Sequence, residues 1–143
     1  MSDRLHLDNQ LCFALYAASR AMTAAYAPLL DGLDLTYPQY LVMLVLWERD
    51  GERVSRIGER LYLDSATLTP LLKRLEARGL IERKRSEADE RVVEVFLTTA
   101  GKRLERKAND IPGCMLERVK LSVGEVAKLR AQVQALTDRL RAD

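Results

Sequence analysis

Two short helical segments, whose predicted caps Ser55 and Asp64 are nine residues apart, constrain the fold of this chain more than any other feature. Ile57 and Leu61 give the first segment an apolar inner face. In the second segment, leucines recur at helical spacing until Gly79 ends the pattern (Leu68, Leu71, Leu72, Leu75). The sequence therefore predicts two helices joined by a tight turn.

A β-hairpin is predicted directly after this pair of helices. Residues 80–85 and 92–97 are β-prone, and the polar residues 86–91 separate them. Two helices followed by such a hairpin form a winged helix-turn-helix, in which the second helix can enter the DNA major groove and the hairpin can reach the minor groove. We predict a mainly α fold with a small β wing and a DNA-binding region over residues 53–98. A winged fold that binds another protein is the alternative.

The residues before this region predict two further helices. Asp8 is expected to cap the first, which Pro28 and Gly32 then interrupt. Residues 36–39 have the form of a capping box, and residues 40–47 are apolar nearly all round. The second of these helices is therefore expected to be the buried centre of the fold.

The residues after the hairpin predict more helix. Thr98 or Thr99 is expected to start a helix that Pro112-Gly113 bends or breaks, and residues 122–125 form another capping box. Apolar residues then follow at heptad spacing (Val126, Leu129, Val133, Leu136, Leu140). This row either packs on the first helix of its own chain or joins two chains. We predict one domain over 1–143, with dimerisation helices in 1–35 and 99–143.

Composition and charge exclude several classes of protein. The two cysteines lie 102 positions apart and His6 is the only histidine, so we expect no metal and no cofactor. The sequence holds neither an apolar run of membrane-spanning length nor a signal peptide, and we expect a cytoplasmic protein with no membrane partner. The net charge is only +2, but six basic and two acidic residues occupy positions 73–85. Such a segment suits a phosphate backbone, although a solvated helix face is the alternative.

Cys12 lies on the apolar side of the first predicted helix. A free cysteine in this setting is most often a small buried hydrophobe. If Asp8 caps the helix, Cys12 lies about four residues inside it, where the partial positive charge of the N-terminus favours a thiolate.

The whole chain resembles the MarR superfamily of dimeric bacterial repressors. Within that superfamily, LDNQLCFALYAASR, LTYPQYLVMLVLWE, LYLDSATLTPLLKRLEARGLIERKRS and ADERVV resemble the organic-hydroperoxide-sensing repressors. The distinguishing residues are the cysteine in CFALY and the tyrosines in AYAPLL and TYPQY.

This resemblance implies that Cys12 is the peroxide-reactive thiol and that Tyr26 and Tyr37 reach across a homodimer to hydrogen-bond its sulfur. The implied protein is not an enzyme but a repressor, which binds double-stranded operator DNA at an inverted repeat when Cys12 is reduced and leaves when an organic hydroperoxide oxidises it. Apolar neighbours are expected to favour oxidants with organic tails (Leu11, Phe13, Leu15, Met22, Leu29). Two alternatives remain: a repressor of the same fold released by a phenolic or aromatic ligand, and a thiol peroxidase that uses Cys12.

The predicted DNA contacts divide by chemistry. Three side chains of the second helix are expected to meet base edges or nearby phosphates (Thr67, Thr69, Lys73), and Ser65 is expected to lie on the same DNA-binding surface. Arg74 and Lys84 are expected to meet phosphates, and Arg85 to lie on the same DNA-binding surface. Arg91 is expected to enter the minor groove with Asp89 orienting it.

Cys114 decides how an oxidised Cys12 would be held. The resemblance implies one-cysteine and two-cysteine forms of these sensors, the second form having a thiol in the C-terminal helices that bridges to the other subunit. Cys114 lies in that region, in what we expect to be a helix break at residues 110–116. The alternative is a buried Cys114, with small-molecule thiols capping Cys12.

Overall fold

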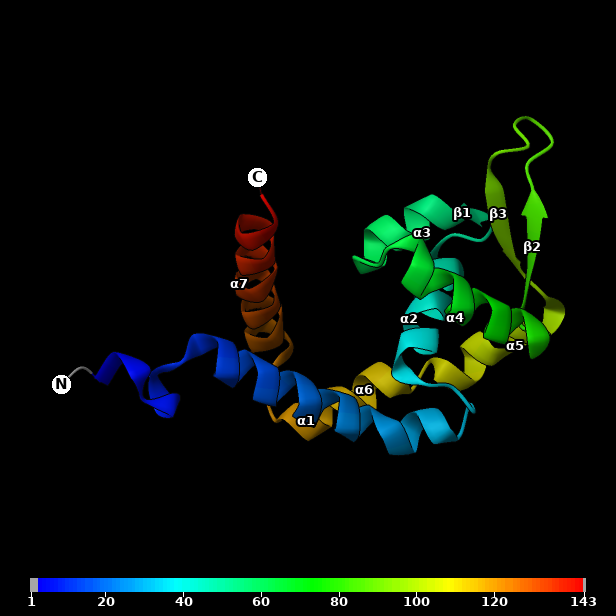
Figure 1. The fold of residues 1–143 in the computed structure, drawn as a ribbon. Helices are drawn as coiled ribbons and strands as arrows, with labels where there is room; N and C mark the ends of the chain where they lie inside the picture. Colours follow the sequence, from blue (N-terminus) through cyan, green and yellow to red (C-terminus); the bar gives the residue numbers. More distant parts are fainter. Residues whose placement is uncertain (1–2, 143) are drawn as a thin grey trace. The chain divides into compact units, whose positions relative to one another are not determined.

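The computed structural model describes residues 3–142, so the outermost residues of the predicted ranges 1–35 and 99–143 lie outside the described residues. The described chain is mostly helical with a three-stranded antiparallel sheet (Figure 1), as predicted. It forms two compact units, one ending at Asn109 and the other beginning at Asp110.

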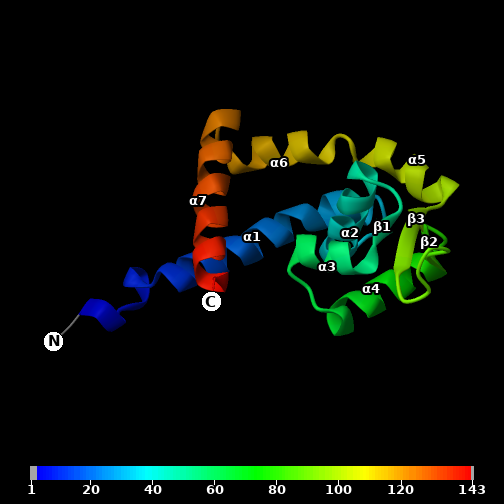
Figure 2. The same ribbon diagram turned by 90° about the horizontal axis from the view of Figure 1, so that it is seen from above.

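The first unit holds all the strands and five α-helices of the described chain. Its elements, after two 3-10 helices at Asp3–Leu5 and Leu7–Asn9, are α1 (Leu11–Asp31), α2 (Tyr37–Glu48), β1 (Glu52–Arg53), α3 (Val54–Leu61), α4 (Ser65–Ala77), β2 (Ile81–Arg85), β3 (Val93–Leu97) and α5 (Thr99–Ala108). Helix α2 contacts α1, α3 and α4, as the views in Figures 1 and 2 agree. The order α3, α4, β2, β3 confirms the predicted winged helix-turn-helix.

The sheet joins the predicted hairpin to a strand that the sequence did not predict. Strand β3 lies in the centre and pairs with β2 and with the two-residue strand β1. Val95 is fully buried and lies opposite Arg83 on one side and Glu52 on the other. Two residues are too few to show a strand pattern, so β1 follows from pairing with β3 rather than from local sequence.

The core of the first unit lies around α2, as predicted. Val42, Met43 and Leu46 are fully buried, and the Thr36 hydroxyl and the Gln39 side chain form the predicted capping box. The indole Nε1 of Trp47 donates to the backbone oxygen of Gly101 at the start of α5 (3.0 Å). A Cβ at Gly101 would lie 2.2 Å from the Leu80 backbone oxygen, so this close approach requires glycine.

Three local predictions about helix ends in the first unit are wrong. Asp8 lies in a 3-10 helix, and α1 begins at Leu11 after Gln10, whose amide holds the preceding turns by donating to the Arg4 and His6 carbonyls (2.6 and 2.9 Å). Pro28 does not interrupt α1, because the missing N–H costs one helical bond while the following turn still anchors the helix through buried Leu30; the helix does end at Asp31, immediately before the predicted Gly32. Ser55 lies inside α3, which begins at Val54 because pairing of β1 with β3 sets the end of the strand.

The second unit consists of α6 (Ile111–Val119) and α7 (Val123–Arg141). The predicted capping box of α7 is present, with Ser122 and Glu125 exchanging hydrogen bonds of 3.0 and 3.1 Å. Pro112-Gly113 does not break a helix: the break falls at residues 109–110, and Pro112 lies in the first turn of α6, where a missing N–H costs little.

Candidate DNA-binding face and redox site

Helix α4 has one apolar face and one exposed polar face. Leu68, Leu72 and Leu75 are buried, which fixes the helix against the core. The Asp64 carboxylate caps its start by accepting from the backbone N–H of Thr67 (2.8 Å), and hydrogen bonds with Thr67 lower the pKa of Asp64. Of the five predicted DNA contacts on α4, Thr69 is half-buried. The other four are exposed (Ser65, Thr67, Lys73, Arg74). The helix therefore presents short polar and basic groups on one side.

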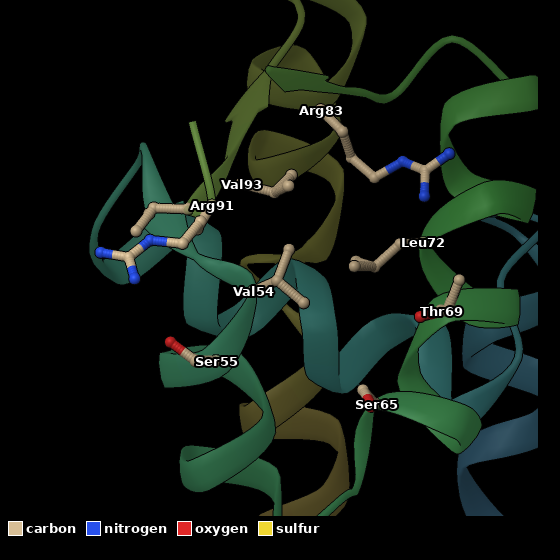
Figure 3. A pocket seen from close by; sticks show the side chains of 9 residues that line it. Val54, Ser55, Ser65, Thr69, Leu72, Arg83, Arg91 and Val93 are labelled. Carbon is tan, nitrogen blue, oxygen red and sulfur yellow. The ribbon is translucent and has the colours of Figure 1, made fainter. Parts of the chain in front are cut away.

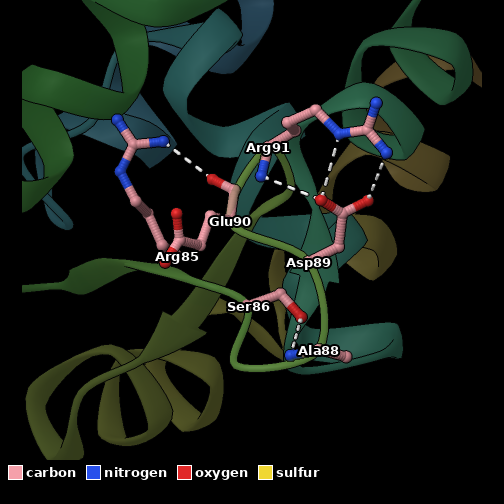
Figure 4. Close-up of polar contacts among 6 residues, drawn as sticks. All are labelled: Arg85, Ser86, Ala88, Asp89, Glu90 and Arg91. Atoms are coloured by element: carbon pink, nitrogen blue, oxygen red, sulfur yellow. Dashed lines mark hydrogen bonds and ion pairs between the residues drawn. The ribbon is translucent and has the colours of Figure 1, made fainter.

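The tip of the wing is held by its own polar side chains (Figure 4). Asp89 accepts from the Arg91 backbone N–H (3.1 Å) and from two guanidinium nitrogens of Arg91 (3.2 and 3.3 Å). These hydrogen bonds lower the pKa of Asp89. The Arg91 side chain is nonetheless 91% exposed, so Asp89 orients a guanidinium that remains open to solvent.

A cavity of about 350 Å³ joins the wing to both helices of the helix-turn-helix (Figure 3). Residues from α3, α4, β2, β3 and the loop between the two strands line it (Val54, Ser55, Ser65, Thr69, Leu72, Arg83, Arg91, Val92, Val93). The structure thus brings Ser65, Thr69 and Arg91 to the edge of one hollow, although they are up to 26 positions apart in sequence. Ser55 and Arg83 also line this hollow, and neither was predicted as a site residue. Alternation along β2 offers a signal for Arg83, since it lies on the same strand face as Arg85.

Several basic residues of the segment 73–85 hold the fold together. The Glu76 carboxylate accepts from the Arg83 backbone N–H (3.0 Å) and from its Nε and Nη2 (3.0 and 2.9 Å), which ties β2 to α4, and these hydrogen bonds, the backbone one first, lower the pKa of Glu76. Arg85 donates to the Glu90 backbone oxygen (2.9 Å), and Lys84 lies 3.5 Å from Glu82. The charge available to DNA is therefore smaller than the count along the sequence suggests.

Cys12 is exposed and is the second residue of α1. Within the described chain Cys12 is therefore not buried, although a cysteine among apolar residues is most often a small buried hydrophobe. It also lies closer to the start of the helix than predicted, because α1 begins only after Gln10. Exposed apolar side chains surround this end of α1, including Leu11 at 63% and Phe13 at 42%. Only Leu15 and Leu29 of the predicted apolar neighbours are half-buried.

Tyr26 and Tyr37 pack together in the first unit. Their ring centroids are 5.0 Å apart, and the Tyr40 ring lies 5.8 Å from Tyr26 and 6.3 Å from Tyr37. Burial raises the pKa of all three hydroxyls, that of Tyr40 to about 12, so the phenols are hydrogen-bond donors at neutral pH. Tyr26 follows Cys12 by fourteen residues on the same helix, which separates them by about 21 Å along the axis. The two residues therefore do not meet through α1 of one chain.

Cys114 is the fourth residue of α6 and is exposed. Its backbone N–H donates to the Asp110 oxygen (3.0 Å), so it lies in a formed helical turn and not in the predicted break. Because Cys114 is exposed within the described chain, the alternative that it is a buried small residue is wrong there. Cys12 and Cys114 belong to different compact units.

Within residues 3–142, no three His, Cys, Asp or Glu side chains gather in a way that suits a metal ion. No helix there is both long and apolar enough to cross a membrane.

Comparison with known proteins identifies a family of regulators. Residues 24–108 match the family described as transcriptional regulator SarA/Rot. The chain is 54% identical over 138 residues to the organic hydroperoxide resistance transcriptional regulator of Bacillus subtilis, covering 96% of this chain and 94% of that protein. These relatives are named as transcriptional regulators, in agreement with the prediction of a regulator and not an enzyme.

Solved structures agree with this result. Reduced AbfR of Staphylococcus epidermidis bound to DNA superposes with a TM-score of 0.81 at 33% identity, over 98% of each chain. AbfR with a disulfide formed superposes with a TM-score of 0.67 at 35% identity, over 94% of this chain and 95% of that one.

Proposed function

We propose, from the premise that this chain belongs to the MarR/SarA family of transcriptional regulators, that it is a repressor which leaves its operator when an organic hydroperoxide oxidises Cys12. One observation carries the redox part of the proposal. Cys12, in the first turn of α1, is exposed among apolar side chains, whereas a structural cysteine of this kind is usually buried.

The DNA-binding part of the proposal rests on the polar face of α4 and on the wing. Exposed Lys73 and Arg74 supply charge for phosphates, and short side chains such as Thr67 allow close approach to base edges. Arg91 extends from the wing tip with its guanidinium oriented by Asp89, as a minor-groove contact requires. A reduced relative of known structure binds DNA with this fold, which supports the assignment.

The chemistry assigned to Cys12 is a two-electron oxidation. The thiolate attacks the terminal oxygen of the hydroperoxide, an S–O bond forms and the O–O bond breaks. The alkoxide leaving group takes a proton to become an alcohol, and the sulfur becomes a sulfenic acid. The reaction begins from the thiolate, which is the nucleophilic form of a cysteine. The exposed Leu11 and Phe13 favour an oxidant with an apolar tail.

A homodimer is part of the proposal because Cys12 lies about 21 Å along α1 from Tyr26 of the same chain. In our proposal Tyr26 and Tyr37 of one subunit donate to the Cys12 sulfur of the other, and two subunits match an inverted-repeat operator. Apolar side chains on α7 offer a surface for such a dimer, since Leu129 is 51% and Leu140 is 76% exposed.

In the two-cysteine form of the mechanism, Cys114 resolves the oxidised thiol. Its sulfur would attack the sulfenic acid of Cys12 in the other subunit, forming a disulfide and releasing water. The exposure of Cys114 and a relative with a disulfide form support this step. The two Cα atoms must approach to within about 7 Å for the bond to form.

The test is operator binding with and without an organic hydroperoxide. The reduced protein should bind DNA from its own upstream region, and one equivalent of cumene hydroperoxide should release it. Cys12→Ser should bind and remain bound, while the matched control Cys114→Ser should still leave the operator, because it keeps the reactive thiol. Release of the Cys12→Ser variant would assign sensing to another group.

A comparison of oxidants tests the apolar pocket separately. Cys12 should react faster with cumene hydroperoxide than with hydrogen peroxide. Equal rates would remove the argument from Leu11 and Phe13 while leaving the redox switch itself intact.

A further inference from the structure

Arg78 ties the end of the recognition helix α4 to the turn between α1 and α2. It follows the last residue of α4, and its guanidinium donates to the backbone oxygens of Asp34 and Leu33, the latter at 3.4 Å. A guanidinium presents its donors as a rigid planar fork, whereas a lysine ammonium is a point charge on a flexible stem. Arg78 therefore fixes the orientation of two successive carbonyls relative to α4.

The backbone that Arg78 holds is itself well defined. Asp34 has φ of 54°, a left-handed conformation that few residues other than glycine adopt. The flanking Leu33 and Leu35 are buried, and both donate their backbone N–H to the oxygen of Leu30 (2.9 and 3.1 Å). Leu33 and Leu35 therefore fix the backbone on both sides of Asp34.

This turn lies between the two tyrosines of the proposed redox site. Tyr26 is on α1 before the turn, Tyr37 is the first residue of α2 after it, and their rings are in contact. Arg78 is also close in sequence to the wing, because β2 begins only three residues later, at Ile81. The turn between them is formed by Gly79, with φ of 74°, and by the Leu80 N–H, which donates to the Leu75 oxygen (3.1 Å). Arg78 is therefore placed between the proposed partners of Cys12 and the junction of α4 with the wing.

We propose that Arg78 is a positioning residue that couples the oxidation state of Cys12 to the position of α4. The inference rests on the proposed function. When an oxidised sulfur loses its hydrogen bonds to the tyrosines, the turn shifts and Arg78 carries the shift to the recognition helix. The two carbonyls carry the coupling, because the Asp34 side chain is 92% exposed and an ion pair to it contributes little.

The quantity that measures this coupling is the operator Kd of the oxidised protein divided by that of the reduced protein. Arg78→Met keeps an unbranched side chain but removes the fork, and we expect it to lower this ratio by about tenfold, within the usual range of allosteric coupling. Arg78→Lys keeps the charge and should also lower the ratio, because it cannot hold both carbonyls. A purely structural role would weaken both states together and leave the ratio unchanged.

Two matched controls separate the fork from charge. Arg60→Met removes another interhelical ion pair, to Glu48 at 3.0 Å, and should keep the wild-type ratio. Asp34→Asn removes the carboxylate but retains both carbonyls and tolerates the left-handed backbone, so it should keep the ratio as well. The rate of Cys12 oxidation, followed by mass spectrometry, should be unchanged in Arg78→Met, because the variant leaves the thiol and its tyrosines in place.

The experiment uses the full chain, a labelled operator from its own upstream region and one equivalent of cumene hydroperoxide. Circular dichroism checks that each variant is folded, and Arg78→Lys decides the matter if Arg78→Met does not fold. Wild-type ratios in the folded Arg78 variants would overturn the coupling role while leaving the redox switch intact. A ratio of one in the wild-type protein would instead refute the proposed function, and the role of Arg78 with it.

Discussion

Replacing Tyr40 by phenylalanine should make the protein resist alkali. Tyr40 is buried in α2, and its ring packs against Tyr26, Tyr37 and Trp47. Burial, followed by the neighbouring Tyr26 and Tyr37 hydroxyls, raises the pKa of Tyr40 from 10.0 to about 12. The folded state therefore keeps this proton at a pH at which the unfolded chain releases it.

The sign and size of the effect follow from linkage between ionisation and folding. Below pH 10 the phenol is neutral in both states, so its contribution to stability is fully present. Between pH 10 and about 12 only the unfolded chain ionises, and the free energy of unfolding falls with rising pH. At 1.36 kcal/mol for each pKa unit, Tyr40 accounts for a loss of about 2–3 kcal/mol across this interval.

Urea unfolding measured from pH 8 to pH 12 tests this reasoning, because the series runs from below the ordinary pKa of 10.0 up to the raised pKa of about 12. The wild-type protein should lose about 2–3 kcal/mol more than Tyr40→Phe, which keeps the ring but has no ionisable hydroxyl. Lysines and arginines titrate in both proteins and cancel in the difference. Parallel losses in the two proteins would show that Tyr40 ionises equally in the folded and unfolded states, and would refute the argument.

Four other outcomes can be checked. Arg91→Ala should weaken operator binding more than about tenfold and reduce its salt dependence, and unchanged affinity at two salt concentrations would remove the wing contact. Trp47→Phe loses the hydrogen bond to the Gly101 oxygen and should cost about 1 kcal/mol in urea unfolding; no change would make that bond unimportant. Arg83 lowers the pKa of Glu76, so the pair stabilises the fold above the usual glutamate pKa of 4.5, and this stabilisation is lost as the pH falls. The stability of Glu76→Gln should therefore fall less steeply in acid than that of the wild-type protein, and equal slopes would count against the pair. One equivalent of hydroperoxide should yield a covalent dimer on a non-reducing gel that Cys114→Ser abolishes, whereas a monomer with a sulfenate or mixed disulfide at Cys12 would indicate the one-cysteine form.

The parts of the fold that depend on local hydrogen bonds were predictable. The capping boxes at 36–39 and 122–125 and the Asp64 cap involve side chains three residues from their partners, so the pattern alone predicts them. Asp8 and Ser55 show the limit of this reasoning. Each is a good cap by residue type, but other contacts decide where the helix starts: the Gln10 amide, which binds the carbonyls of Arg4 and His6, in one case and the long-range pairing of β1 with β3 in the other.

The candidate site was less accessible to sequence reasoning, because it depends on tertiary contacts. Counting charges over residues 73–85 does not reveal that Arg83 binds Glu76 or that Arg78 binds the backbone at Asp34. Likewise, nothing in the spacing of Tyr26 and Tyr37 predicts that their rings touch within one chain. The resemblance to known repressors supplied the roles of these tyrosines and of Cys12, and those roles remain proposals.

The measurement that tests the redox switch most directly follows oxidation and DNA release in the same sample. Hydroperoxide is added in fractions of an equivalent, operator binding is read by fluorescence anisotropy, and the oxidised fraction of Cys12 is read by mass spectrometry. We predict that the released fraction of DNA rises in proportion to the oxidised fraction of Cys12. Complete oxidation of Cys12 with the operator still bound, or release while Cys12 remains reduced, would contradict the proposal.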